Sequence, residues 1–136
     1  MRERAEIQIP FVAGAVVYAK DVERVGHFYS QVAGLPVVHR EQGFQVLQSA
    51  ACQLVVVATA PAIAAQITVE SPPVRREDTA VKLCLAVSSI EVARAVAAKC
   101  GGELNGPQGE WEFQGDPVCD GHDPEGNVIQ VRASVL

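Results

Sequence analysis

The stretch "AVVYAKDVERVGHFYSQVAGL" (residues 15–35) begins with a β-rich run and continues with helical periodicity. Asp21 is a typical N-cap residue, and Gly34 is a typical residue at which a helix ends. Between them, apolar residues recur at helical spacing and would form one buried face: Val22, Val25, Phe28, Tyr29 and Val32. The stretch therefore predicts a strand over residues 11–19, followed by a helix from about Asp21 to Gly34.

The same order returns in "AVKLCLAVSSIEVARAVAAKCGGEL" (residues 80–104). Residues 81–87 predict a strand, and Ser88 with Glu91 has the spacing of a capping box at a helix start. The two glycines that would end the helices, Gly34 and Gly102, lie 68 residues apart in a chain of 136 residues. The offset indicates an internal repeat of half the chain length.

Each predicted helix is followed by three short β-type runs. They are "PVVHRE", "GFQVLQS" and "CQLVVVAT" in the first half, and "ELNGP", "EWEFQG" and "NVIQVRASV" in the second. The segment "DPVCDGHDPEG" (116–126) precedes the last of these runs and is assigned no strand; its Asp-Gly and Pro-Glu-Gly sequences around His122 favour a tight turn. The chain is thus predicted to be a single domain over 1–136, with βαβββ modules at 11–59 and 81–136. Residues 60–80, with three prolines, are predicted to be a linker with a short apolar piece near 63–69.

Charge and composition exclude several classes of protein. The chain has 11 Lys and Arg against 16 Asp and Glu, a formal charge of -5, so nucleic acid is not an expected partner. No run approaches the roughly 18 apolar residues of a membrane span, and no cleavage site follows the N-terminal residues, so we expect a cytoplasmic protein with no membrane partner. The four cysteines form no C-x-x-C pair and are expected to be reduced.

The paired modules, the helix opening "KDVERVGHFYSQVAGL" (20–35) and the closing "DPEGNVIQV" (123–131) resemble the vicinal oxygen chelate superfamily, which includes glyoxalase I, bleomycin-resistance proteins and extradiol dioxygenases. The resemblance extends over about residues 12–135. It implies an α+β fold, in which four strands from each module curl into one eight-stranded mixed sheet. This sheet would form a half-open barrel with the helices outside. The resemblance also implies a ligand cleft inside the curled sheet and a homodimer.

Metal-binding members of that family carry ligands at four positions, which fall here on Gly14, Val55, Lys82 and Gln130. Glycine and valine donate no ligand, an ammonium group repels a cation, and a glutamine is a neutral ligand. We therefore expect no metal ion and no other cofactor. A weaker alternative is a displaced metal site at His122 and Asp120, although Asp-Gly and Pro-Glu-Gly around His122 favour a turn.

Without a metal, the cleft could still bind an organic molecule. Because side chains alternate along a strand, residues two apart from the family positions share their face. The predicted ligand-binding residues are Tyr18, Lys82, Cys84, Trp111, Phe113, Gln130 and Arg132. Two alternatives stay open at this point. Lys82 and Arg132 could lie at the rim and pair with Glu110 and Glu112, and the two aromatic residues could fill core.

Two functions are compatible with these residues. The first is a metal-independent protein that binds a small organic ligand, similar to the bleomycin-resistance branch. The alternative is a lyase, isomerase or dioxygenase of the same superfamily with a non-standard metal site, for which no catalytic residue is assigned. A vestigial cleft without any ligand is a third possibility, because one fold hosts many functions.

Overall fold

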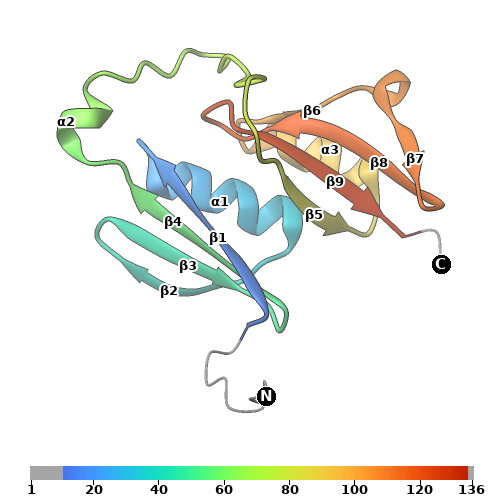
Figure 1. The fold of residues 1–136 in the computed structure, drawn as a ribbon, viewed down its shortest axis with the longest axis horizontal. Coiled ribbons are helices and arrows are strands. Elements are labelled where there is room, and N and C mark those ends of the chain that lie inside the picture. Colours follow the sequence, from blue (N-terminus) through green and yellow to red (C-terminus); the bar gives the residue numbers. More distant parts are fainter. Residues whose placement is uncertain (1–10, 135–136) are drawn as a thin grey trace.

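A computed structural model describes residues 11–134 (Figure 1). The expectations for residues 1–10 and for the end of the last β-type run at Val135 lie outside the described residues. The first module contains β1 (Ala13–Ala19), α1 (Val22–Ala33), β2 (Val37–Glu41), β3 (Phe44–Gln48) and β4 (Cys52–Ala58). After the short helix α2 (Pro61–Ala64), the second contains β5 (Leu83–Val87), α3 (Ile90–Lys99), β6 (Glu103–Leu104), β7 (Trp111–Phe113), β8 (Asp116–His122) and β9 (Val128–Ala133).

The first module forms a four-stranded sheet in the order β1-β4-β3-β2, in which only β1 and β4 run parallel. As predicted, α1 begins at Asp21, whose carboxylate accepts a hydrogen bond from the amide of Arg24 at 3.0 Å. It ends at Gly34, which has a φ of 67°. This left-handed conformation ends a helix and is readily adopted only by glycine.

The second sheet has the order β5-β9-β8-β6, and β7 also pairs with β8. Leu104 in β6 pairs with Gly121, and Trp111 in β7 pairs with Val118, both antiparallel and both on the edge of β8 that faces away from β9. Thus β6 and β7 form one edge strand, interrupted by the 3-10 turn at Pro107–Gly109. With this interruption, the second module keeps the β-α-β-β-β order of the first.

Two features of the second module differ from the sequence-based predictions. Residues 116–122, for which no strand is predicted and whose Asp-Gly pair favours a turn, form the strand β8, which pairs with strands on both sides. The N-cap of α3 is Ser89 and not Ser88, because the Ser89 hydroxyl accepts the hydrogen bond from the amide of Val92 at 3.2 Å. In the first case, pairing in the sheet overrides local turn preferences. In the second, adjacent serines offer two possible registers for one cap.

The α+β class is confirmed, with two sheets of four and five strands and no closed barrel. The predicted single eight-stranded sheet is not formed within the described residues, because β1 and β5 are not paired with each other. Figure 1 shows the two sheets side by side, with α1 and α3 behind them. Each sheet is therefore covered by a helix on one face and leaves its other face uncovered.

One hydrophobic core runs through both modules. Its first part is formed by α1 and the strands in front of it, with Phe28, Leu47, Leu54 and Val56 almost fully buried. In the second part, Ile90, Ala93 and Ala97 of α3 pack with buried residues of the second sheet: Leu85, Leu104, Cys119, Ile129 and Val131. Because the two parts are continuous, the helices join the modules on their inner side.

The turn between β8 and β9, residues 123–127, binds the first module through two buried carboxylates. The hydroxyl of Tyr29 in α1 donates to Asp123 at 2.7 Å. The Glu125 carboxylate accepts from the backbone amides of Lys20 and Asp21, at 2.9 and 2.8 Å. Asp123 and Glu125 are 0% and 7% exposed. We call residues 123–127 the clamp turn, because its side chains hold the start and the middle of α1.

Asp123 also organises its own turn. One carboxylate oxygen accepts from the backbone amides of Glu125 and Asn127, at 2.8 and 3.0 Å, and the other accepts from the side-chain amide of Asn127 at 2.8 Å. Burial raises the pKa of Tyr29 well above its usual range, and the charge of Asp123 and the hydrogen bond between them raise it further. The Tyr29 hydroxyl therefore keeps its proton and remains a donor to Asp123 at neutral pH.

Among the described residues, none of the helices has both the length and the apolar character that a membrane crossing requires. The four cysteines are all free.

We expect Tyr29→Phe to lower the free energy of unfolding by about 1–3 kcal/mol, because the change removes one donor from a buried carboxylate. Urea denaturation followed by circular dichroism measures the effect. The matched control is Tyr18→Phe, since Tyr18 is 65% exposed. This control should change the stability by less than about 0.5 kcal/mol. Equal losses in the two variants would contradict a stabilising role for the bond to Asp123.

Candidate functional site

The uncovered face of the second sheet collects side chains from four strands. Gln130 in β9 pairs with Cys84 in β5 on one side and with Asp120 in β8 on the other. Arg132 follows two residues after Gln130. Val118 in β8 pairs with Arg132 on one side and with Trp111 in β7 on the other. Because directly paired residues point to the same side of a sheet, these side chains share one face. We call it the second-sheet face.

A chain of hydrogen bonds connects the polar groups of this face. The Lys82 ammonium forms an ion pair with one oxygen of Asp120 at 2.7 Å, and the side-chain amide of Gln130 donates to the other oxygen at 3.3 Å. The carbonyl oxygen of Gln130 accepts from Arg132 at 3.1 Å and lies 3.6 Å from the Cys84 thiol. We call Lys82, Asp120, Gln130 and Arg132 the polar chain.

Two aromatic side chains lie at the Arg132 end of the polar chain. The guanidinium carbon of Arg132 lies 4.8 Å from the centre of the Phe113 ring, which is a cation-π contact. Trp111 and Phe113 are 42% and 48% exposed, so neither ring fills the core. The structure thus answers one open alternative from the sequence, because both rings are accessible.

The alternative ion pairs of Lys82 and Arg132 with Glu110 and Glu112 are not formed among residues 11–134. Glu110 pairs with Arg94 of α3 instead, and Lys82 pairs with Asp120. Arg132 uses one guanidinium donor, toward Gln130, and its buried Nε has no hydrogen-bond partner among residues 11–134. Since a guanidinium has five N–H donors, Arg132 keeps donors for a further acceptor.

Tyr18 does not join the other predicted ligand-binding residues. It lies on β1 in the first sheet, is 65% exposed, and forms no contact with the polar chain. Val16, Val55 and Val46 form adjacent pairs on the same side of that sheet as Tyr18. We call this uncovered, mostly apolar surface the first-sheet face. Sequence alternation placed Tyr18 on one face with Lys82, Gln130 and Arg132, but nothing in the sequence showed that β1 belongs to a separate sheet.

The residues at the family's metal positions do not fit a divalent metal. Gln130 is engaged by Asp120 and Arg132, and the Lys82 ammonium occupies the other side of Asp120. Gly14 pairs with Gln53, whose amide donates to a neighbouring glutamine at 2.9 Å. Within residues 11–134, no three His, Cys, Asp or Glu side chains come together as a potential metal site. The Lys82 ammonium group already supplies, next to Asp120, the positive charge that a metal ion would bring.

The alternative site at His122 and Asp120 also lacks donors. His122 is 4% exposed, and its Nδ1 lies 2.8 Å from the backbone oxygen of Asp123. Its Nε2 lies 3.8 Å from Glu103, whose side chain is largely exposed. Asp120 is engaged by Lys82 and Gln130. Cys119, the neighbouring thiol, points to the opposite face, where burial raises its pKa and it contacts Arg94.

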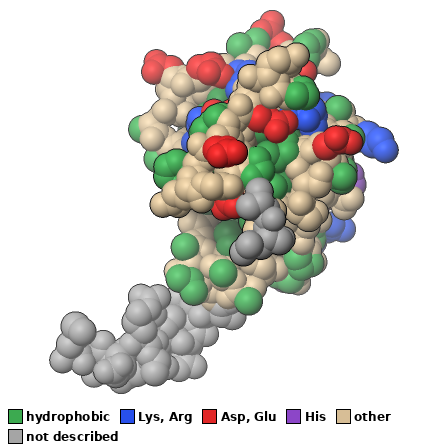
Figure 2. All heavy atoms as spheres, turned by 90° about the vertical axis from the view of Figure 1, so that its right-hand side faces the viewer, with side chains coloured by type: hydrophobic (Ala, Val, Ile, Leu, Met, Phe, Trp, Pro, Cys, Tyr) green, Lys and Arg blue, Asp and Glu red, His purple; other side chains and the backbone are tan. Residues whose placement is uncertain are grey.

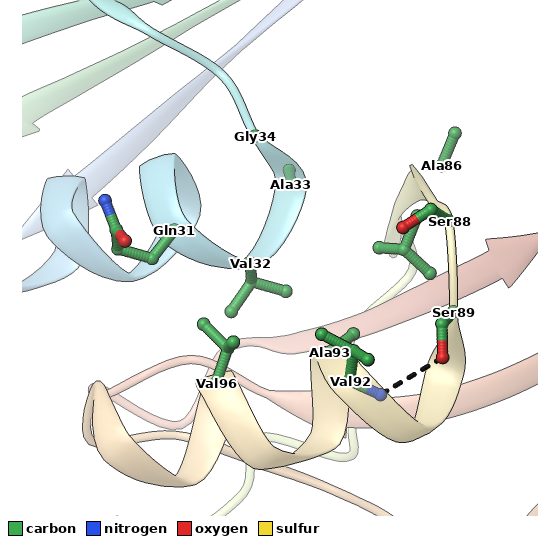
Figure 3. A pocket seen from close by; sticks show the side chains of 11 residues that line it. Gln31, Val32, Ala33, Gly34, Ala86, Ser88, Ser89, Val92, Ala93 and Val96 are labelled. Carbon is green, nitrogen blue, oxygen red and sulfur yellow. Dashed lines mark hydrogen bonds between the residues drawn. The ribbon is translucent and has the colours of Figure 1, made fainter.

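A groove of about 340 Å³ lies elsewhere, between the end of α1 and the start of α3 (Figure 3). Figure 3 shows Val32, Val92 and Val96 pointing toward one another from the two helices. The Ser89 hydroxyl at the rim already accepts the capping hydrogen bond from Val92. No residue that lines the groove is titratable, so it offers packing surface but no chemistry.

The side of the second module carries several acidic side chains (Figure 2). Figure 2 shows the molecule from the side of the second module, with acidic side chains spread among hydrophobic ones. Such a surface does not match the basic patches that contact nucleic-acid phosphates.

Sequence reasoning missed the role of Asp120 as the centre of the polar chain. Once residues 116–122 are known to form a strand, Asp120 pairs with Gln130 in β9 and therefore lies on the second-sheet face. Because no strand was predicted over residues 116–122, the alternation of side chains along a strand was not applied there.

The fold and the site define a protein of two βαβββ modules with an open, polar and aromatic sheet face. The sequence matches the glyoxalase-like domain family over residues 14–132, and the chain therefore belongs to that family. It is thus a member of the vicinal oxygen chelate superfamily. No curated protein matches the sequence.

Solved structures share the fold at low identity. The bleomycin resistance determinant encoded on transposon Tn5 is 16% identical, with a TM-score of 0.58 over 90% of this chain and 97% of that chain. TnmS3, an antibiotic binding protein from Streptomyces sp. CB03234, is 21% identical, with a TM-score of 0.59 over 94% and 98%. A glyoxalase/bleomycin resistance protein/dioxygenase family enzyme from Burkholderia phytofirmans PsJN is 19% identical, with a TM-score of 0.62 over 88% and 95%.

Proposed function

We propose that this protein binds a small organic molecule without a metal ion, and that the ligand lies on the second-sheet face. The observation that carries the proposal is the arrangement of Arg132, Phe113 and Trp111. Two accessible rings stand beside a guanidinium that keeps unused donors. Such a site suits a planar aromatic compound with a carbonyl or carboxylate oxygen, which stacks on the rings and accepts from Arg132.

The remainder of the polar chain positions Arg132. Gln130 holds the guanidinium through its carbonyl oxygen, and Gln130 is held in turn by Asp120. Lys82 compensates the Asp120 charge. Because these groups satisfy one another, the polar chain is preorganised for binding, and its own acid, Asp120, is engaged by two donors. Binding is also what the name of one structural neighbour describes, the antibiotic binding protein TnmS3.

We further propose that two copies of the chain form a homodimer that closes the cleft. In one chain, the polar second-sheet face lies open, and the apolar first-sheet face is also uncovered, with Val16 57% and Tyr18 65% exposed. An exposed apolar sheet face is a typical interaction surface. If the first-sheet face of one copy covers the second-sheet face of the other, the ligand lies between an apolar wall and a polar one.

The binding proposal is tested by fluorescence, because the only tryptophan of the chain, Trp111, lies at the site. We expect saturable quenching with a planar aromatic carboxylate from a panel of aromatic acids, amides and amines. Arg132→Gln should weaken that binding about tenfold or more, since it removes a charge-assisted hydrogen bond. Arg40→Gln, the same change at an exposed residue of β2, is the control. Equal affinities of both variants would exclude the Arg132 role.

The enzyme alternative, with metal at His122 and Asp120, is separated from binding by metal analysis. We expect protein purified without added metal to contain well under one equivalent of zinc, iron, nickel or manganese per chain. The physical reason is the missing donor set around Gln130 and Lys82. A stoichiometric metal that is lost in Asp120→Ala, together with a measurable turnover, would establish the alternative.

The dimer is tested by sedimentation. We expect a mass of two chains for the native protein, and Val16→Glu should shift it toward a single chain because a charge on an apolar interface is costly. The control is Val92→Glu on α3, because Val92 is 59% exposed, close to the 57% of Val16. A native protein that sediments as one chain at the concentrations of the binding assay would overturn the closed cleft.

A further inference from the structure

A second pocket lies where the linker passes over the end of β1. Its walls enclose about 420 Å³, which is within the range of small-molecule sites. It is lined by Tyr18, Thr59, Ala60, Ile63, Ile67, Arg76 and Glu125. Most of these residues come from the segment between the two modules, which Figure 1 shows running from β4 through α2 toward β5. We call it the linker pocket; none of its residues lies on the second-sheet face.

The linker is fixed to both modules, so the pocket is preformed. At the beginning of the linker, the Thr59 amide donates to the Ala19 carbonyl at 2.9 Å, and the Lys20 ammonium donates to the carbonyl of Ile67. At the other end, the Arg76 amide donates to the carbonyl of Gly126 in the clamp turn at 2.7 Å. A preformed pocket binds with a smaller loss of conformational entropy than a flexible one.

The walls of the linker pocket are mainly apolar. Ala60 directly precedes α2, Ile63 lies in α2, and Ile67 follows four residues after Ile63. Ile63 is 57% exposed and lines the pocket. These side chains would cover an aliphatic or aromatic body.

Two charged side chains line the pocket, Arg76 and Glu125. The Arg76 guanidinium forms no ion pair or hydrogen bond with any residue in the part of the chain that the structure describes, whereas its backbone is held by Gly126. The other charged group, Glu125, already accepts from the backbone amides of Lys20 and Asp21 at the start of α1. Its charge is therefore stabilised by the helix N-terminus, and Arg76 remains the group that can take a new partner.

We propose that the linker pocket binds a small organic monocarboxylate with an apolar tail. The carboxylate accepts from the Arg76 guanidinium, a pairing favoured by the fork of N–H donors, and the Tyr18 hydroxyl offers a further donor. The tail lies along Ile63 and Ile67. This site is independent of the second-sheet face, so the chain would bind two chemically different ligands.

The experiment is isothermal titration of the complete chain with octanoate, octanol and octylamine, which share a tail and differ in the head group. We expect octanoate to bind more tightly than octanol. Octylamine should bind most weakly, because Arg76 repels its ammonium group and the Glu125 carboxylate is already engaged by two backbone amides. Octylamine binding as tightly as octanoate, or no octanoate binding at all, would overturn the proposal.

Two variants separate the head group from the tail. Arg76→Gln should weaken octanoate binding about tenfold and leave octanol binding unchanged, since the change removes only the charged partner. Ile63→Ser should weaken both ligands. The controls are Arg40→Gln and Val38→Ser on β2, where Val38 is 56% exposed. Unchanged octanoate affinity in Arg76→Gln would overturn the proposal; because the Arg76 side chain has no partner within residues 11–134, this variant should fold normally.

The two binding sites are distinguishable in the same protein. Saturation with octanoate should leave the quenching of Trp111 by an aromatic carboxylate unchanged, and Arg132→Gln should leave octanoate binding unchanged. Competition between the two ligands, or loss of octanoate binding in Arg132→Gln, would mean that octanoate occupies the second-sheet face and would overturn the separate site.

Discussion

The arrangement of this molecule depends on the two buried carboxylates of the clamp turn. Asp123 accepts from Tyr29 in the middle of α1, and Glu125 accepts from the two backbone amides that precede the helix. Burying two acids is costly unless their oxygens are hydrogen-bonded, and here both carboxylates have several donors. The bonds are long-range in sequence, and they fix the second module against the first at one defined position. The same turn holds the linker, through the bond from Arg76 to Gly126.

The clamp turn contacts the first module on the side of the sheets that the helices cover. The modules are joined through α1, α3 and the clamp turn, so neither sheet needs its other face for stability. Both of these faces stay uncovered in the single chain, one with an apolar surface around Val16 and the other with the polar chain around Gln130. Because the fold is stabilised on the helix-covered side, residues on the uncovered sheet faces can vary without loss of the fold. This is consistent with the many functions found on this fold.

The sequence predicted the fold from its repeat, because caps and helical periodicity are local signals. Asp21 and Gly34 begin and end α1 as expected. It failed at β8, where Asp116, Gly121 and their neighbours are turn-forming residues but the strand is paired on both edges. Alternation placed Lys82, Gln130 and Arg132 on a common face, and the structure connects them. It could not show that Tyr18 lies on a separate sheet, since pairing between β1 and β5 has no local sequence signal.

The clamp acids were visible in the sequence only as part of a turn, because their partners Tyr29 and Lys20 are about a hundred residues away. Asp123 forms the turn through local bonds to Asn127, as the sequence indicated, and it also binds across the modules, which only the tertiary structure reveals. A hydrogen bond over this distance in sequence depends on helix packing and strand register together. Local turn chemistry therefore predicted the conformation of residues 123–127 and not their role.

Gln130 shows why a single amide suits this site better than the glutamate that the family resemblance implies. Its side-chain nitrogen donates to the Asp120 carboxylate and its side-chain oxygen accepts from the Arg132 guanidinium. Gln130 therefore bridges a negatively and a positively charged side chain. A glutamate could accept from Arg132 but would place a second negative charge against Asp120 and could donate to it only when protonated. The amide therefore keeps Asp120, Lys82 and Arg132 in one balanced chain. In this chain the position that would carry a metal ligand in other members instead orients a guanidinium toward the aromatic rings.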